Sequence, residues 1–171
     1  MIYSYSPLLV SFAIVAFIGG QIAVSAQTEG KPQTSKLKVT DAQHILSGHC
    51  ELLQRTVEFP DRLKTAFTKI TGQDKFSLAN PGEDFQVGDV IYRKLPSRRL
   101  VMAGKCEGFW FIHYEQGGIG HSYGLVLFQD EPNGETSFVW GGRGFVKCDT
   151  VEKLRKAIAG GLLSDLRQYY W

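Results

Sequence analysis

The sequence has few cysteines and only a small excess of positive charge, and both features limit what the protein can be. Its 171 residues include three cysteines, and 19 basic against 17 acidic side chains give a formal net charge of +2. Such a small charge predicts no strong attraction to nucleic acid or to an anionic membrane surface. The sequence also contains no internal repeat and no Asn-x-Ser/Thr glycosylation acceptor. A single domain without a repeat architecture is therefore expected.

Basic residues are also missing from the start of the chain, where a long apolar run lies. Residues 7–24 are almost wholly apolar, and small or slender residues follow at positions 24–26. This pattern predicts a secretory signal peptide that is cleaved after Ala26, although no Lys or Arg precedes the run. Retention of the segment as an N-terminal anchor is the alternative. Because no cysteine lies close behind the run, attachment of a lipid to a new N-terminal cysteine is not expected.

Cleavage would leave a domain of ordinary size in an exported protein. We expect residues 1–26 to be the signal peptide, 27–38 a flexible polar linker and 39–171 one domain able to bury a core. The predicted location is periplasmic or extracellular, with no stable membrane insertion after cleavage. An oxidising compartment favours one disulfide and one leftover thiol among three cysteines. We predict a Cys106–Cys148 disulfide, because Cys50 lies on the apolar stripe of a predicted helix.

Helical spacing appears at both ends of the domain. Thr40 and Gln43 form a capping-box pattern, and the apolar stripe that follows predicts a helix with these positions on one face: Ala42, Ile45, Leu46, His49, Cys50, Leu53 and Val57. A second helix is predicted from Pro60 to Gly72, with Leu63, Ala66, Phe67 and Ile70 as its apolar stripe. A third begins after an Asp149 cap and ends at Gly160, and a short helical piece is expected over Ser164–Tyr169.

Between these helices the spacing becomes typical of strands. Five β-rich runs are separated by glycine- and proline-rich turns, at residues 85–92, 100–103, 109–115, 121–129 and 136–140. Short connections between successive strands favour an antiparallel meander. The predicted fold class is therefore α+β: a five-stranded antiparallel meander sheet with N-terminal and C-terminal helices packed on one face.

The first candidate site is the predicted hairpin from Trp110 to Gly124. If Glu115 faces His121 and His113 faces Tyr123, strand alternation puts these four side chains on one face near the tip. Two imidazoles and a carboxylate can hold a metal or share a proton. A polar hairpin end with no such role is the simpler interpretation, and we predict neither a metal nor a cofactor.

The second candidate is a surface of aromatic side chains. Many aromatic residues fall in the predicted strands, among them Trp110, and alternation sends some of them to the face without helices. An exposed aromatic face would bind a protein, peptide or glycan. The alternative is that these rings belong to the core.

The third candidate is a thiol nucleophile. A helical Cys50, a Gly-Asp-led strand at residues 88–91 and a strand opened by His121 follow one another along the chain. In this order the sequence resembles the NlpC-type cysteine hydrolases, which implies a peptidase or amidase with Cys50 as nucleophile and His121 as base. However, a nucleophilic cysteine belongs at an accessible helix N-terminus, whereas Cys50 lies ten residues beyond the predicted cap.

These observations favour a binding protein over an enzyme. We predict a non-enzymatic binding or interaction module, of the inhibitor, immunity or surface-recognition type, which acts through the aromatic sheet and the hairpin. Its predicted contact residues are Trp110, His113, Glu115, His121 and Tyr123. The secreted cysteine hydrolase is the alternative.

Overall fold

The computed structural model describes residues 38, 42, 46–88, 94–118 and 120–163. The predicted signal peptide, the linker up to residue 37 and the expected helical piece at 164–169 lie outside these residues. Within the described part of the chain, no helix combines the length and the apolar character that crossing a bilayer requires.

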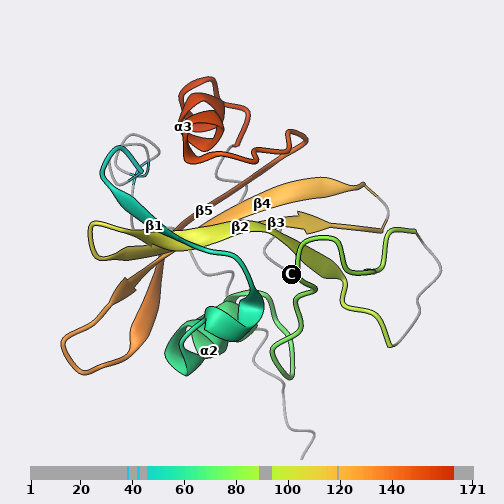
Figure 1. Cartoon of the computed structure of the whole chain (residues 1–171), viewed down its shortest axis with the longest axis horizontal. Helices are drawn as coiled ribbons and strands as arrows, with labels where there is room; N and C mark the ends of the chain where they lie inside the picture. Colours follow the sequence, from blue (N-terminus) through green and yellow to red (C-terminus); the bar gives the residue numbers. More distant parts are fainter. Residues whose placement is uncertain (1–37, 39–41, 43–45, 89–93, 119, 164–171) are drawn as a thin grey trace, which may run out of the picture. The chain divides into compact units, whose positions relative to one another are not determined.

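A five-stranded antiparallel sheet forms the centre of the domain (Figure 1). Its strands are β1 (Cys50–Leu53), β2 (Arg98–Cys106), β3 (Phe109–Gln116), β4 (Ser122–Asp130) and β5 (Thr136–Gly144), and each pairs with the next along the chain. Glu107 and Gly108 join β2 to β3 with φ values of 46° and 89°, which suit a two-residue turn of type I′. The predicted α+β fold class and antiparallel meander are therefore confirmed.

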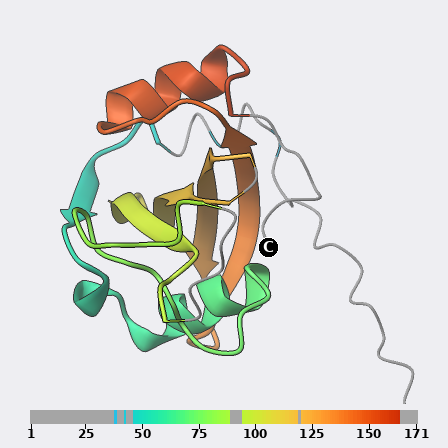
Figure 2. The same ribbon diagram turned by 90° about the vertical axis from the view of Figure 1, so that its right-hand side faces the viewer.

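Two α-helices cover opposite faces of this sheet (Figures 1 and 2). α2 (Asp61–Ile70) packs with sheet residues such as Ile112 and Val126 in one apolar cluster. α3 (Val151–Ala159) packs with Phe111 and other sheet residues in a second cluster. The prediction that the helices lie on one face is therefore wrong. Neighbouring strand residues such as Phe111 and Ile112 are both apolar, so each face of the central strands needs its own cover.

The local signals for α2 and α3 agree closely with the structure. The four buried residues of α2 are the predicted stripe, Leu63, Ala66, Phe67 and Ile70, and Gly72 follows the helix with a φ of 62°. α3 is capped by Thr150, whose Oγ1 accepts a hydrogen bond from the Lys153 backbone N–H at 3.2 Å. Asp149, the predicted cap, instead binds the Lys153 ammonium at 2.6 Å.

The predicted helix does not extend through Cys50. Ala42 is helical and its carbonyl oxygen accepts from the Leu46 backbone N–H at 3.3 Å, but the chain then turns and residues 50–53 form a strand. Cys50 pairs with Cys106 across the β1–β2 ladder, and the two form a disulfide. The predicted Cys106–Cys148 disulfide is wrong, and Cys148 is a buried free thiol. The apolar spacing around Cys50 predicted a helix that the structure does not form there, for two reasons. Gly48 interrupts the pattern and weakens the helical propensity, and pairing with β2 outweighs what remains of it.

The predicted strand at residues 85–92 is also absent from its described part, residues 85–88. β1 takes the fifth place in the sheet instead. Among the described residues, Ala79 makes the one bridge to the free edge of β2 in this region, an isolated parallel bridge to Arg99. The edge of β2 thus changes neighbours between Arg99 and Ala103, where β1 begins to pair. A β-bulge at Val101 lies in this interval, since Leu100 faces Tyr114 and Met102 faces His113.

Candidate functional site

The β3–β4 hairpin brings most of the predicted contact residues together, but with a different register. Glu115 faces Tyr123 and His113 faces Leu125, so the pairing differs by two residues from the one assumed. A shift of two residues keeps every side chain on its predicted face, since side chains alternate with a period of two. The set therefore survives the error in register, on the sheet face that α3 covers.

Glu115 is the centre of this set. Its side chain is buried, and both carboxylate oxygens have charged or polar partners. Oε2 accepts from Arg99 Nε at 3.2 Å and from Arg99 Nη2 at 2.7 Å, while Oε1 lies 2.7 Å from His121 Nε2. The Arg99 guanidinium also lies over the Phe85 ring, 4.4 Å from its centroid. A carboxylate this buried requires such partners. Its contact with His121 in turn holds the half-exposed imidazole ring in place.

His113 is part of the same face but serves the interior. Its ring is fully buried: Nδ1 lies 2.9 Å from the Gly124 carbonyl oxygen, and Nε2 accepts from the Cys148 backbone N–H at 3.2 Å. Burial is the main cause that lowers the pKa of His113 to about 4. The neutral ring therefore carries its proton on Nδ1 and ties the hairpin to the segment after β5.

The other predicted contact on this face is Tyr123, which is half-buried between the two imidazoles. Its ring centroid lies 6.0 Å from that of His113 and 5.4 Å from that of His121. Burial, and then the negative charge of Glu115, raise the pKa of the Tyr123 hydroxyl. Within the described residues, no group of three histidine, cysteine or acidic side chains is arranged to hold a metal ion. The side chains of His113 and Glu115, which the sequence offered as possible metal ligands, already bind protein partners through their nitrogen and oxygen atoms.

Trp110 does not belong to this site. It is buried on the α2 face, where Nε1 donates to Asp130 Oδ1 at 3.0 Å and the Lys105 ammonium lies 4.8 Å from the ring centroid. The predicted aromatic binding face is also wrong, because these strand aromatics are core residues: Trp110, Phe111, Tyr114, Phe128, Phe138 and Trp140. Alternation distributes them over two faces, and each face is covered by a helix.

The structure also contradicts the arrangement that a cysteine hydrolase needs. Cys50 is a strand residue whose sulfur is bonded to Cys106, so it has no thiolate to offer. Cys148 does have a free thiol, but it is 1% exposed, and burial, followed by the charge of Asp149, raises its pKa. Its backbone, rather than its sulfur, contacts His113. A reactive cysteine needs the opposite conditions, exposure and a lowered pKa.

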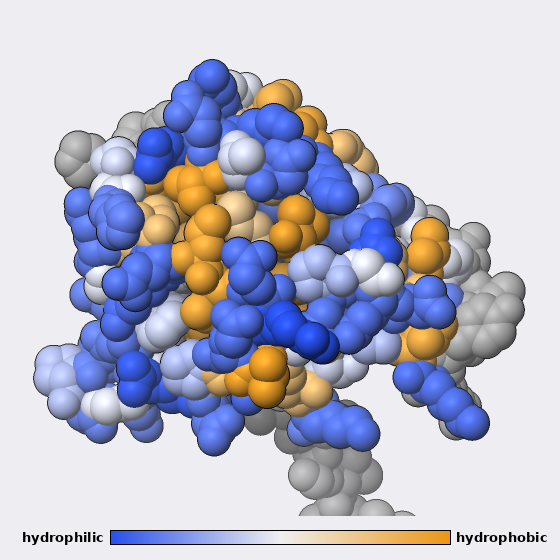
Figure 3. All heavy atoms as spheres, viewed as in Figure 1, coloured by the Kyte–Doolittle hydropathy of each residue, from blue (hydrophilic) through white to orange (hydrophobic). Residues whose placement is uncertain are grey.

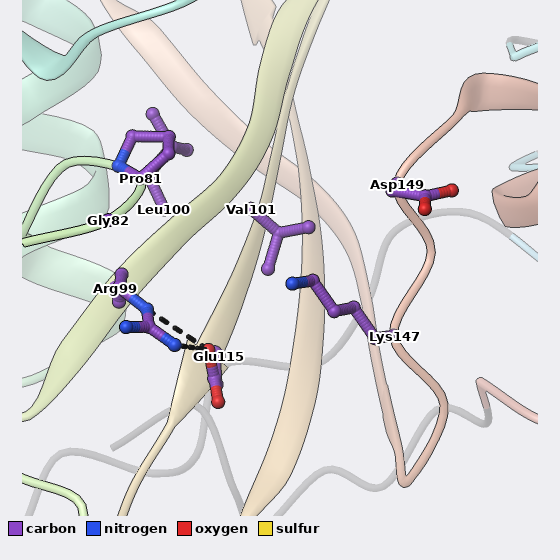
Figure 4. Close-up of a pocket in the computed structure, with 8 residues that line it drawn as sticks. All are labelled: Pro81, Gly82, Arg99, Leu100, Val101, Glu115, Lys147 and Asp149. Carbon is purple, nitrogen blue, oxygen red and sulfur yellow. Dashed lines mark hydrogen bonds and ion pairs between the residues drawn. The ribbon is translucent and has the colours of Figure 1, made fainter.

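A pocket of about 300 Å³ lies beside Glu115 (Figure 4). It is lined by residues from the loop before β2, from β2 and β3, and from the segment between β5 and α3: Pro81, Gly82, Arg99, Leu100, Val101, Glu115, Lys147 and Asp149. The pocket opens where the bulge at Val101 interrupts the regular ladder of β2. Bulges are common next to binding sites, because they turn a side chain out of the regular pleat.

Lys147 is the one pocket cation that has no carboxylate partner among the described residues. Figure 4 shows its ammonium directed toward Val101 and the Arg99–Glu115 pair, while the Asp149 carboxylate points away. Asp149 instead forms an ion pair with Lys153. The charge of Lys147 still acts on its surroundings. After burial it adds to the lowering of the pKa of His113, and after the hydrogen bond with Lys153 it adds to the lowering of the pKa of Asp149.

Exposed apolar side chains adjoin the pocket in sequence. Phe145, which is 81% exposed, and Val146 directly precede Lys147, and Leu162 is a third exposed apolar residue, whose backbone lies against Gly144. The space-filling view shows a further apolar area between α3 and the sheet, framed by hydrophilic residues (Figure 3). Large apolar side chains left in solvent are typical of a contact surface.

Of these pocket residues, Glu115 alone was a candidate in the sequence analysis, which missed Arg99, Val101 and Lys147 among others. Arg99 belongs to a basic run at residues 93–99, a pattern usual for a solvated turn, and Lys147 is a lone cation after a strand. The available signal was the strand register: a strand that pairs with β3 must place a residue opposite Glu115, and Arg99 holds that place.

Comparisons with known proteins give no relative from which a function could be inferred. No model of a known protein family matches the chain, and no curated protein or solved structure is detectably similar to it.

Proposed function

We propose that this protein is an exported, non-enzymatic binding domain that holds its ligand in the pocket beside Glu115. The observation that carries the proposal is the pocket itself, in which a pre-positioned charged group lies against an aliphatic wall. The Arg99–Glu115–His121 set is rigid because each member is bound to another, and Val101 and Leu100 supply apolar surface. Pre-formed pockets with a few oriented polar groups are the usual form of a ligand site.

The contact surface is smaller than the sequence predicts and lies in a different place. His121 and Tyr123 adjoin it through Glu115, and the exposed Phe145 and Val146 directly precede Lys147 in the chain. His113 supports it from within, and Trp110 is excluded because it is buried on the other face. The cysteines also favour binding over thiol-based catalysis, because neither Cys50 nor Cys148 presents an accessible thiol.

Export is the second part of the proposal. Its support is the apolar run at residues 7–24 with a cleavage pattern at Ala26, together with the Cys50–Cys106 disulfide, a bond that persists in oxidising compartments. Intact-mass measurement and N-terminal sequencing of protein recovered from outside the cytoplasm should give a chain that starts at Gln27. A chain that retains Met1 would contradict cleavage.

The binding proposal is tested by selecting from a displayed library of short random peptides on the purified, immobilised protein. Enriched peptides should bind the unaltered chain and lose binding to Val101→Trp, because the larger side chain fills the pocket. Pro81→Trp, at an exposed loop position on the opposite wall, is a second blocking variant that does not disturb the strand. Val57→Trp is the matched control, since Val57 is 75% exposed and does not line the pocket. Peptides that bind all four proteins equally, or no enrichment at all, would contradict a ligand site in this pocket.

A further inference from the structure

The charges around the pocket can be paired one by one, and one positive charge remains. Arg99 is balanced by Glu115 through two hydrogen bonds, and Lys153 is balanced by Asp149 at 2.6 Å. Lys147 has no carboxylate oxygen within 4 Å among the described residues, and its ammonium is directed into the pocket (Figure 4). A cleft with one uncompensated ammonium attracts an anion.

The neighbours of Lys147 restrict which anion fits. The Arg99 donors are already engaged, so no bidentate guanidinium fork faces the ligand. A phosphate carries about −1.5 to −2 charge and is usually held by several donors. Here the Glu115 carboxylate also lines the pocket and repels a dianion. A single carboxylate, with one negative charge, matches a single free ammonium.

The remaining wall describes the rest of the ligand. Val101, Leu100 and Pro81 offer aliphatic surface, and a volume of about 300 Å³ holds a group of the size of one small amino acid. The exposed Phe145 and Val146 beside Lys147 can contact residues that extend beyond the pocket. The complementary ligand is therefore a peptide with a carboxylate next to a short aliphatic side chain.

We propose that the pocket beside Glu115 binds a peptide carboxylate, which pairs with Lys147 while an adjacent aliphatic side chain lies against Val101. This inference rests on the proposed binding function and names the chemistry of its ligand. The carboxylate can come from a free peptide C-terminus or from an acidic side chain, and both sources present the same group to Lys147.

Three small peptides separate these possibilities. N-acetyl-Ala-Val carries a C-terminal carboxylate, its C-terminal amide lacks one, and N-acetyl-Val-Glu amide carries a carboxylate only on its side chain. Each is titrated into the purified protein at low salt while backbone amide shifts of Val101, Glu115 and Lys147 are followed by NMR. We expect the acid to bind and its amide to bind several-fold more weakly. The Val-Glu peptide tells which source of carboxylate is preferred.

The variant Lys147→Gln should weaken binding of the acid by about five-fold, the effect of losing one exposed ion pair, and should leave the amide unaffected. Lys156→Gln is the matched control, because Lys156 is an exposed lysine of α3 that pairs with Glu152. Equal binding of acid and amide at this pocket would overturn the carboxylate assignment and leave the proposed binding function standing. Absence of any shift, or a stronger response to inorganic phosphate than to every peptide, would also overturn it. The peptide selection with the blocking variants tests the binding function independently.

Discussion

The two ends of the β3–β4 hairpin carry similar charged groups that serve different purposes. At one end, Asp130 accepts hydrogen bonds from Arg62, Lys105, Trp110 and Thr136, and the Cys50–Cys106 disulfide lies beside the β2–β3 turn. We call this the disulfide end. At the other, the pocket end, Glu115 has Arg99 and a half-exposed His121 as partners, and the space beside them is open. The same chemistry therefore locks one end and leaves the other available to a ligand.

The difference lies in how many elements each carboxylate joins. Partial burial acts to raise the pKa of Asp130, but its hydrogen bonds outweigh this effect and lower the pKa to about 2. Its partners come from α2, β2, β3 and β5, so Asp130 connects the helix to the sheet. Glu115 joins only neighbouring strands and the end of its own hairpin. Changes at the disulfide end should therefore cost stability, and changes at the pocket end should cost binding.

The largest expected effect is loss of the disulfide. A loop closed over 56 residues contributes about 4 kcal/mol in the chain-entropy model, so replacing both Cys50 and Cys106 by Ala should lower the free energy of unfolding by about that amount. Urea unfolding measures it. Cys148→Ala is the control and should cost about 1 kcal/mol, since it removes only a small buried side chain. A larger cost for Cys148→Ala than for the double variant would contradict the observed pairing.

The second effect is a dependence of stability on pH that comes from His113. Its pKa is about 4 in the folded protein and about 6.5 when unfolded, so the unfolded chain alone takes up a proton between these values. The contribution of His113 is full above pH 6.5 and is lost as the pH falls to 4, by about 3 kcal/mol. Unfolding free energies of the wild type and of His113→Gln, measured between pH 4 and 7, should differ in slope. Equal slopes for the two proteins would contradict a buried, neutral His113.

The third effect is at Asp130. Asp130→Asn keeps the size of the side chain but removes the charge that Arg62 and Lys105 face, and we expect a loss of about 2 kcal/mol near neutral pH. In the wild type this contribution is present above about pH 4 and disappears as the pH falls toward 2, because the folded pKa is lowered. Thermal unfolding of Asp74→Asn, an exposed carboxylate, provides the control. Equal melting temperatures for the two variants would show that Asp130 does not lock its end.

The smallest effect on stability is expected at Glu115. Glu115→Gln retains hydrogen-bonding capacity toward Arg99 and His121 and loses only the charge. Because the Arg99 and His121 side chains are themselves 29% and 44% exposed, solvent screens their side of the pair, and a loss of about 1 kcal/mol is expected. Binding to the selected peptides should fall more strongly than stability does, because Arg99, no longer paired with a negative charge, is held less firmly at the edge of the pocket. If Glu115→Gln destabilises the fold more than Asp130→Asn does, the contrast between the two ends is wrong.

The parts of the fold that the sequence predicts correctly are those with a strong local pattern. The four-residue stripe of α2 and the glycine that follows it need no distant partner, and the hairpins carry their own turn residues. The extent of β5 was predicted too short because Gly141–Gly144 reads as a turn. In the structure these glycines continue the strand. They are needed there for close packing, because a side chain at Gly142 would overlap the Trp140 ring and one at Gly144 would overlap the Leu162 backbone.

The candidate site divides in the same manner. His113, Glu115, His121 and Tyr123 come together because a single hairpin contains all four, and alternation assigns their face even when the register is misjudged. Arg99 and Lys147 come from other segments, and no local pattern in either one points to Glu115. Trp110 was placed in the site by its position in the hairpin, whereas its odd offset from His113 sends it to the opposite face.

By itself, the sequence determined that this protein is an α+β domain with an antiparallel meander, where α2 and α3 form, and which hairpin gathers titratable side chains. Only the tertiary structure decided that Cys50 pairs with Cys106, that the two helices cover opposite faces, and that Lys147 points into a pocket beside Glu115. The physical reason is range. Helix and turn formation depend on residues a few positions apart, whereas disulfide partners, sheet edges and pockets depend on which distant segments the chain brings into contact.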